Sequence, residues 1–186
     1  MNERHRQLQF DVATFARKAG YGVIVEKKIS FHNEGKRADL IIQRGSAKQD
    51  LVIDITVGLP TCDAHVGVAS KTPNATIAKK EKEKNTKYFD NCAKDNLEFK
   101  PLAFEAFGAW SPTFVNFFKD TLNKMGAHGQ YRNSQVNYWT KRISCTIMKF
   151  NSRCIMSKIN CIGYNKSFGD EAFRDDIVES YGISDV

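Results

Sequence analysis

The chain has 186 residues, of which 41% are hydrophobic and 26% are charged, and its formal net charge is +7. This composition is typical of a globular protein with one sizeable core. No apolar run approaches the roughly 20 residues that span a membrane, and the N-terminus has no apolar signal core. We therefore expect an intracellular protein without membrane partners, nuclear or wherever its target resides, with free thiols at its five cysteines.

The charge is distributed unevenly along the chain. Residues 121–169 carry eight Lys or Arg and no acidic residue, whereas the tail, 170–186, holds six acids and one base. The tail therefore has a charge of −5, and the remainder of the chain has +12. A surplus of that size favours a polyanionic partner, with nucleic acid as the first expectation. Solubility alone is the alternative explanation.

The first half of the chain predicts a helix followed by three strands. Residues 5–19 place apolar side chains on one helical stripe, and the glycines that follow end this helix. A β-rich run covers 21–31. Two further apolar runs, 38–42 and 51–57, flank a polar turn that contains glycine, which predicts a pair of neighbouring strands.

The second half predicts mainly helices. After a loop at 58–70, Thr72 is expected to cap a second helix in which Pro73 is the first helical residue. A short apolar strand at 101–108 follows, and Ser111 with Pro112 then caps a third helix. A long basic amphipathic stretch covers roughly 134–160. These patterns predict an α/β fold with a helical C-terminal part.

Each of the two neighbouring strands carries one aspartate, Asp39 or Asp54, among residues that favour burial. A carboxylate in a core strand costs several kcal/mol unless it is paired, hydrogen-bonded or bound to a metal. In an antiparallel pair the two positions can lie side by side, where they would call for a divalent cation, a shared proton or an arginine between them. Oxygen ligands suit Mg²⁺ or Mn²⁺. A basic protein that holds such an ion suggests phosphodiester chemistry on DNA.

The same residues resemble a known family. The run R-A-D at 37–39, the D-I-T at 54–56 and the fourteen residues between the two aspartates resemble the core of the PD-(D/E)XK nucleases, which have the restriction-endonuclease-like fold. The resemblance implies a mixed central sheet flanked by helices. Two positions depart from the pattern, because Ala38 stands where proline is common and Thr56 stands where the family has its lysine.

A subset of the family carries that lysine on the following helix. The DITV at 54–57 and the KEKNTKY at 82–88 resemble the restriction-like endonuclease domain of LINE-type retrotransposons. The resemblance covers about residues 5–158, including His5 in the opening helix and Glu26 in an early strand. It implies a nuclease of the mobile-element or homing type.

Helical geometry indicates which lysine would take the role. At 100° per residue, Ile77, Lys84 and Tyr88 lie close together on one helical face. Lys84 therefore lies at the edge of the apolar stripe that should face the sheet, and it is the first candidate, with Lys87 as the second. The alternative is that the run KKEKEKNTK forms a solvated charged face with i,i+4 pairs.

Several further residues could contribute to the metal shell. We expect the carbonyl of Ile55 to join the two aspartates as a ligand. Glu105, the only acid in its strand, could complete the shell, orient Lys84 or form a structural salt bridge, and Glu26 has the same alternatives. His5 and Asp11 are weaker candidates. The Cys62-x-x-His65 pair has no partner pair at zinc-finger spacing, so zinc is not expected.

The basic stretch provides candidate contacts to the DNA backbone. Lys141, Arg142 and Arg153 lie among aromatic residues, and Lys80 is a further candidate. Cations of this kind can bind phosphates but carry no sequence-reading power of their own. We expect Trp139 to lie in the core.

Together these features predict a Mg²⁺-dependent DNA endonuclease that hydrolyses phosphodiester bonds in double-stranded DNA. Residues 1–125 would form the nuclease core, 126–169 a basic helical extension packed on it, and 170–186 an acidic tail. A non-catalytic DNA-binding module on the same fold is the alternative that Thr56 favours. The other alternative is a structure-selective junction resolvase, which homodimerisation and a preference for branched DNA would distinguish.

Overall fold

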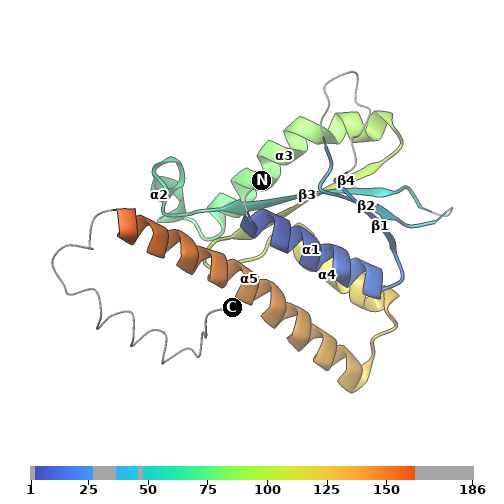
Figure 1. Cartoon of the computed structure of the whole chain (residues 1–186). Helices are drawn as coiled ribbons and strands as arrows, with labels where there is room; N and C mark the ends of the chain where they lie inside the picture. The colour runs from blue at the N-terminus through green and yellow to red at the C-terminus, as the bar shows by residue number, and fades with distance from the viewer. Residues whose placement is uncertain (1–2, 27–36, 46–47, 162–186) are drawn as a thin grey trace. The chain divides into compact units, whose positions relative to one another are not determined.

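The computed structural model describes residues 3–26, 37–45 and 48–161, with side chains up to residue 157. The predicted acidic tail at 170–186 lies outside these ranges. The elements follow in the order α1 (Glu3–Lys18), β1 (Gly22–Val25), β2 (Leu40–Gln43), β3 (Leu51–Gly58), α2 (Asp63–Ala69), α3 (Ala75–Lys94), β4 (Glu98–Glu105), α4 (Pro112–Lys124) and α5 (Gly129–Cys161) (Figure 1). The chain forms two compact units, residues 1–149 and 150–186.

The four strands form one mixed sheet in the order β1-β2-β3-β4. β2 is antiparallel to both β1 and β3, whereas β4 is parallel to β3. A parallel neighbour needs a crossover connection, and α3 supplies it between β3 and β4. The predicted mixed α/β architecture with a helical C-terminal part is therefore confirmed, as is the pairing of the two aspartate-bearing strands.

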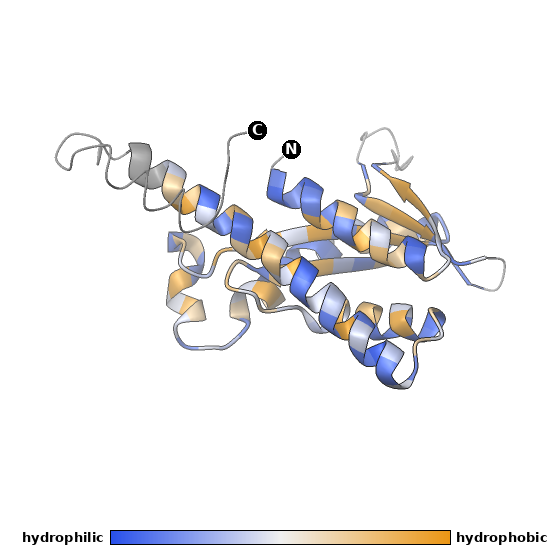
Figure 2. Ribbon diagram, turned by 60° about the horizontal axis from the view of Figure 1, so that its bottom comes forward, coloured by the Kyte–Doolittle hydropathy of each residue, from blue (hydrophilic) through white to orange (hydrophobic). Residues whose placement is uncertain are grey.

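The two faces of the sheet have different cores. Side chains alternate along β3, so that Leu51, Ile53 and Ile55 join a large apolar cluster with buried residues of α1, α4 and α5. Val52 points the other way, into a small cluster on the α3 side. Figure 2 shows hydrophobic residues along parts of the strands, and hydrophobic and hydrophilic residues mixed along each helix. Trp139 is buried in the large cluster, as predicted.

The helix boundaries confirm one predicted cap and correct another. Ser111 caps α4, because its Oγ accepts a hydrogen bond from the Phe114 backbone N at 3.1 Å. The predicted start at Thr72 and Pro73 is wrong, because α3 begins at Ala75 after Asn74, whose φ of 61° is left-handed. The Thr72 backbone N instead donates to the carbonyl of Val68, closing the turn after α2. The predicted loop at 58–70 thus contains a short helix.

The described part of α5 reaches into the second unit. Residues 150 and 151 are half-buried, while 152–157 are exposed. Among the described helices, none is both long enough and apolar enough to cross a membrane.

Candidate functional site

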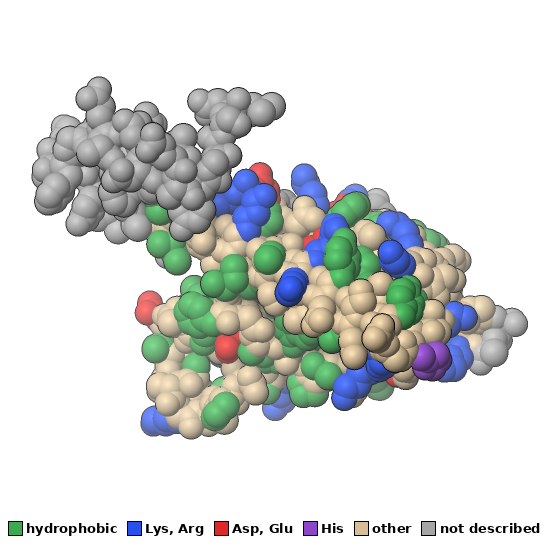
Figure 3. Space-filling model, turned by 90° about the horizontal axis from the view of Figure 1, so that it is seen from below, with side chains coloured by type: hydrophobic (Ala, Val, Ile, Leu, Met, Phe, Trp, Pro, Cys, Tyr) green, Lys and Arg blue, Asp and Glu red, His purple; other side chains and the backbone are tan. Residues whose placement is uncertain are grey.

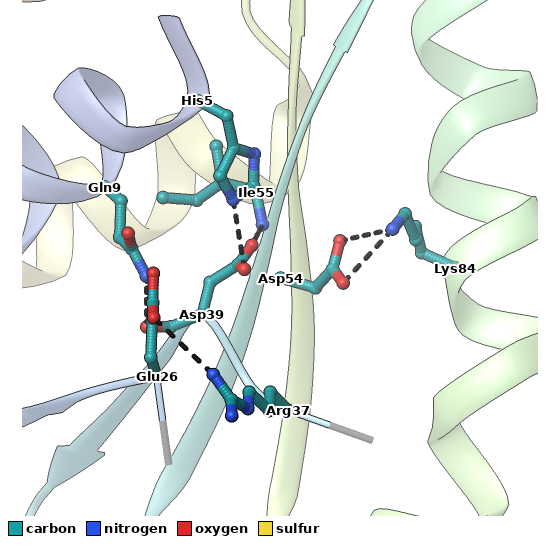
Figure 4. Close-up of polar contacts among 8 residues, drawn as sticks. All are labelled: His5, Gln9, Glu26, Arg37, Asp39, Asp54, Ile55 and Lys84. Carbon is teal, nitrogen blue, oxygen red and sulfur yellow. Dashed lines mark hydrogen bonds and ion pairs between the residues drawn. The ribbon is translucent and has the colours of Figure 1, made fainter. Parts of the chain in front are cut away.

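The antiparallel register brings the two predicted aspartates together. Leu40 pairs with Ile53, so Asp39, one residue before β2, lies opposite Asp54. The backbone N–H of Ile55 donates to Asp39 Oδ2 at 2.6 Å, which fixes the Asp39 carboxylate against β3 (Figure 4). The register thus places Asp39 and Asp54 at opposed positions on neighbouring strands, and their role as a shared metal site stays a prediction.

Lys84 of α3 lies against Asp54. Its Nζ is 2.8 Å from Asp54 Oδ2 and donates a hydrogen bond to Oδ1 at 3.1 Å (Figure 4). The side chain of Asp54 is only 9% exposed and that of Lys84 is 27% exposed. The stripe that predicted this position is present, since Ile77 is buried and Tyr88 packs against Phe99. The structure therefore directs Lys84 toward the carboxylates and away from bulk solvent.

One oxygen of Asp54 is incompletely satisfied. Oδ2 is buried and has no hydrogen bond of acceptable geometry, although Nζ of Lys84 is close to it. Two other buried oxygens on the same side of the sheet, Oγ1 of Thr76 and Oε1 of Glu81, have no hydrogen-bond partner among the described residues, and both belong to α3. Buried polar atoms are normally hydrogen-bonded, and exceptions mark places where water, an ion or a ligand can bind.

The pKa values of this pair follow from burial and from the neighbouring charges. Burial raises the pKa of Asp54 above its usual 3.8, the charge of Asp39 adds to this, and Lys84 works against it. Burial works to lower the pKa of Lys84, but the hydrogen bond and charge of Asp54 outweigh it, so the pKa of Lys84 lies above 10.5. Lys84 is therefore a charged ammonium group in contact with the Asp54 carboxylate.

Helix α1 holds Asp39 from the other side of the sheet. His5 Nε2 lies 3.0 Å from Asp39 Oδ1, and Gln9 Nε2 donates to the Asp39 carbonyl at 2.7 Å. The hydrogen bond with Asp39 raises the pKa of His5 above 6.5, against an opposing effect of burial. His5 Nε2 and the Ile55 backbone N therefore contact the two different oxygens of the Asp39 carboxylate. The weaker candidate His5 proves to be a direct neighbour of the aspartate pair.

Gln9 is the neighbour that the sequence analysis missed. It is buried on α1 and lies one helical turn after His5, at the i,i+4 spacing that puts two side chains on the same face. The i,i+4 spacing of these two polar residues within the apolar stripe of α1 could have indicated the role of Gln9.

Two of the predicted acids do not join the pair. Asp54 is opposite Pro101 on β4, and Glu105 is four residues further along, about 13 Å away at the usual strand rise. Glu26 contacts Asp39 through its backbone N, which donates to the Asp39 carbonyl at 3.0 Å. Its carboxylate is 4.0 Å from Arg37 Nη1 (Figure 4). Neither position brings a third carboxylate to Asp54.

The other predicted residues have separate surroundings. Lys87 is exposed, with its Nζ 5.0 Å from the centre of the Tyr88 ring. Thr56, at the position where the family has its lysine, is half-buried on β3. The backbone of Ile55 serves Asp39 through its N–H, and the role of its carbonyl as a ligand stays a prediction.

The predicted DNA-contacting residues lie on different elements. Lys80, on α3, pairs with Glu83 at 2.9 Å, and Lys141 is exposed on α5. Arg142 is committed internally, since its Nε donates to buried Asp11 at 2.8 Å and its Nη1 donates to the Tyr138 hydroxyl at 3.0 Å. These contacts give Arg142 a structural role, and its contact with DNA stays a prediction.

Arg153 belongs to the second unit, where its guanidinium group lies over the Phe150 ring. Figure 3, which views the protein from below Figure 1, shows Lys and Arg side chains at several separate places and few Asp or Glu on that face.

Comparison with known proteins adds no relative, because no family model and no curated protein matches the chain. The chemistry of the site is therefore read from its own residues. Two adjacent carboxylates can hold a hard cation, and the charged ammonium group of Lys84 can orient a water molecule or neutralise developing negative charge.

Proposed function

We propose that the protein is a Mg²⁺-dependent, or Mn²⁺-dependent, DNA endonuclease with a restriction-endonuclease-like core of the PD-(D/E)XK type. The observation that carries the proposal is the contact between Lys84 Nζ and Asp54 Oδ2 at 2.8 Å, on a strand that also holds Asp39 in place through Ile55. A lysine from α3, the second helix after β3, thereby reaches Asp54, although Thr56 occupies the family's lysine position.

The residues present fit a magnesium ion. Asp54 Oδ2 is a buried oxygen that contacts the Lys84 ammonium group at 2.8 Å, and Asp39 occupies the opposed position on the neighbouring strand. Within the described ranges no group of three or more His, Cys, Asp or Glu converges on one point. Magnesium sites commonly use only one or two protein carboxylates and complete their shell with water and substrate phosphates. When bound, the ion would supply positive charge at the scissile phosphate.

The protein's own residues supply the remaining functions. Lys84 carries a charge that would orient the attacking water and stabilise the negative charge that develops on phosphorus oxygens. Ile55 and His5 hold the two oxygens of Asp39, so its carboxylate is preorganised before substrate arrives. Preorganisation of this kind lowers the reorganisation needed during reaction.

A non-catalytic DNA-binding module is the second candidate. It is favoured by the same two contacts, because both oxygens of Asp39 already accept from groups of the protein. A carboxylate satisfied in this way gains less from binding a metal than one that faces water. This alternative predicts DNA binding that is independent of Mg²⁺.

Cleavage of supercoiled plasmid and of an end-labelled duplex, with Mg²⁺, Mn²⁺ or EDTA, tests the proposal. Wild type should cut with either metal, while Asp54→Asn and Lys84→Met should bind the duplex but lose at least about 100-fold in rate. Lys87→Met is the matched control and should cut normally. Binding without cutting by wild type would instead establish the binding module.

If Lys84→Met cuts while Lys87→Met does not, the endonuclease stands and the assignment of the lysine is wrong. Circular dichroism and urea unfolding of each variant separate lost chemistry from lost folding.

A further inference from the structure

A second polar concavity lies away from the two aspartates. It is a pocket of about 400 Å³, formed by the turn ends of β2 and β3 together with the C-terminal half of α4 and the residue Tyr21. Its volume falls within the range of small-molecule sites, roughly 300–1,000 Å³.

The pocket is rich in positive charge. Arg44, Lys48, Lys100 and Lys124 line it, and Asp120 is the one acidic residue among the lining residues. Glu98, beside the pocket, accepts from Arg44 Nη2 at 2.6 Å and lies 3.0 Å from Lys100 Nζ. Asp50 Oδ1 also accepts from the Arg44 backbone N at 3.2 Å, and with Glu98 and Asp50 both counted the pocket keeps a surplus of one positive charge.

The contacts of Arg44 leave it well ordered. Its Nε donates to the carbonyl of Gln49 at 2.6 Å, and Glu98 holds the guanidinium group at a second nitrogen. The side chain of Arg44 is only 13% exposed. A guanidinium group that is fixed before binding loses little rotamer entropy when an anion arrives.

The rest of the lining is apolar. Ile42, Leu51 and Phe117 are buried residues that form part of the wall. Tyr21 adds an aromatic ring, with Lys124 Nζ 5.8 Å from its centre. Burial, and then the charge of Asp120, raise the pKa of the Tyr21 phenol, which therefore stays a neutral hydrogen-bonding group. Ile42, Leu51 and Phe117 are at most 4% exposed, so the half-buried ring of Tyr21 is the apolar surface that a flat aromatic group could pack against, and an inorganic anion would leave it unused.

The pocket is separate from the candidate active site. Ile42 and Leu51 point to the large-cluster face of the sheet, whereas Asp54 points to the α3 side. Arg44 also follows the end of β2 that is opposite to Asp39. The pocket shares no residue with the aspartate pair or with the basic residues singled out in the sequence.

We propose that this pocket binds a nucleotide, with its phosphate at Arg44, Lys100 and Lys124 and its base against Tyr21. Charge-assisted hydrogen bonds from Arg and Lys suit phosphate oxygens, and aromatic side chains suit the faces of bases. The nucleotide is either free or an unpaired unit of a nucleic-acid strand. The proposal goes beyond the endonuclease function and does not depend on it.

Isothermal titration of the full-length protein with adenosine 5′-monophosphate tests the proposal, with adenosine and inorganic phosphate as partial ligands. The monophosphate should bind more tightly than either part. Lys124→Glu and Lys48→Glu should each weaken its binding by about tenfold, since each places a negative charge at the pocket. Lys119→Glu is the matched control, because Lys119 is exposed on α4 and does not line the pocket. It should change the Kd by less than about twofold.

A labelled oligothymidine distinguishes the two sources of the nucleotide. If the monophosphate and the oligomer compete, and Lys124→Glu weakens the binding of both, the natural ligand is an unpaired nucleotide unit of a nucleic-acid strand. Binding of the monophosphate without competition identifies a free nucleotide. The proposal is overturned if the monophosphate fails to bind, if adenosine or phosphate alone binds as tightly, or if Lys119→Glu weakens binding as much as Lys124→Glu. Urea unfolding of each variant confirms that it is folded under the titration conditions.

Discussion

Asp11 and Asp54 are both buried carboxylates paired with a cation, but their oxygens are satisfied to different degrees. Asp11 Oδ1 accepts from Arg142 Nε at 2.8 Å and from Gln7 Nε2 at 3.2 Å, and its Oδ2 accepts from the Thr146 hydroxyl at 2.7 Å. Asp54 has one cation as its neighbour, Lys84, whose Nζ donates to Oδ1 at 3.1 Å and forms an ion pair with Oδ2 at 2.8 Å.

Asp11 therefore has a structural role, whereas Asp54 is held by the Lys84 ammonium group and could accept further interactions. Both oxygens of Asp11 accept hydrogen bonds from groups of the protein, and the bonds from Arg142 and Thr146 join α1 to α5. Asp54 lies beside a second carboxylate, and the charge of Asp39 is one cause of its raised pKa. A fold that tolerates like charges near each other and satisfies a buried carboxylate through a single ammonium group gives up stability at a position where a second cation can restore it.

The largest effect on stability is expected from Asp11→Ala. The substitution leaves Arg142 and Thr146 without their acceptor in the α1–α5 interface, which should cost about 3 kcal/mol in the free energy of unfolding. Urea denaturation measures the loss. Gln7→Ala, which removes a weaker donor to the same carboxylate, should cost less than about 1 kcal/mol. Equal losses from the two substitutions would contradict the structural role assigned to Asp11.

The next effect is the coupling between Lys84 and Asp54. In a double-mutant cycle with Lys84→Met and Asp54→Asn, we expect an interaction energy of about 2 kcal/mol, because the two groups are in contact and mostly buried. The same cycle with Lys87→Met should give a value near zero, since Lys87 is exposed. Urea unfolding of the four proteins in each cycle supplies the numbers. A larger coupling for Lys87 would mean that the wrong lysine faces Asp54.

The contrast between Asp54 and Asp11 also shows what sequence alone could reach. The pairing of the two aspartate strands follows from short apolar runs around a turn, and the position of Lys84 follows from helical periodicity. Both are local rules that need no knowledge of distant residues. These rules found the two carboxylates and the lysine that contacts one of them.

Long-range packing decided the features that the sequence did not reveal. Asp11 owes its role to Arg142, 131 residues further along the chain, and no local pattern links the two. Glu105 is displaced from Asp54 because the register of the parallel pair β3–β4 depends on how α3 crosses between them. The start of α3 was predicted wrongly because Thr72 was already used in the turn after α2.

A smaller effect is expected where α3 packs against the end of β3. A Cβ added at Gly58 would lie 2.5 Å from Thr76 Cγ2, so Gly58→Ala should destabilise the protein by about 1–2 kcal/mol through overpacking. Thr76→Ser removes that methyl group and should recover most of the loss in the double variant. Gly67→Ala in α2 is the control, because nothing lies within 4 Å of its added Cβ. If Thr76→Ser does not restore the stability of Gly58→Ala, the contact between Gly58 and Thr76 does not determine how α3, which carries Lys84, packs against β3.

The smallest effect is expected at Glu98, a paired carboxylate that is 36% exposed. It tests whether burial or pairing contributes more to the stability that a carboxylate provides. Burial works to raise its pKa, but hydrogen bonds from Lys100 and Arg44 outweigh it, so its pKa lies below 4.5. A lowered pKa means that the ionised form stabilises the fold. That contribution is present above pH 4.5 and disappears as the pH falls through the lowered pKa.

Glu98→Gln should therefore be less stable than wild type at neutral pH, by only about 0.5 kcal/mol because solvent screens the pair. Urea unfolding at a series of pH values should show this difference vanishing in acid. A difference that persists in acid would assign it to packing and not to charge. If Glu98→Gln instead loses as much stability at neutral pH as Asp11→Ala, exposure does not determine how much a carboxylate stabilises the fold. The number of its oxygens that accept hydrogen bonds would then be the better predictor.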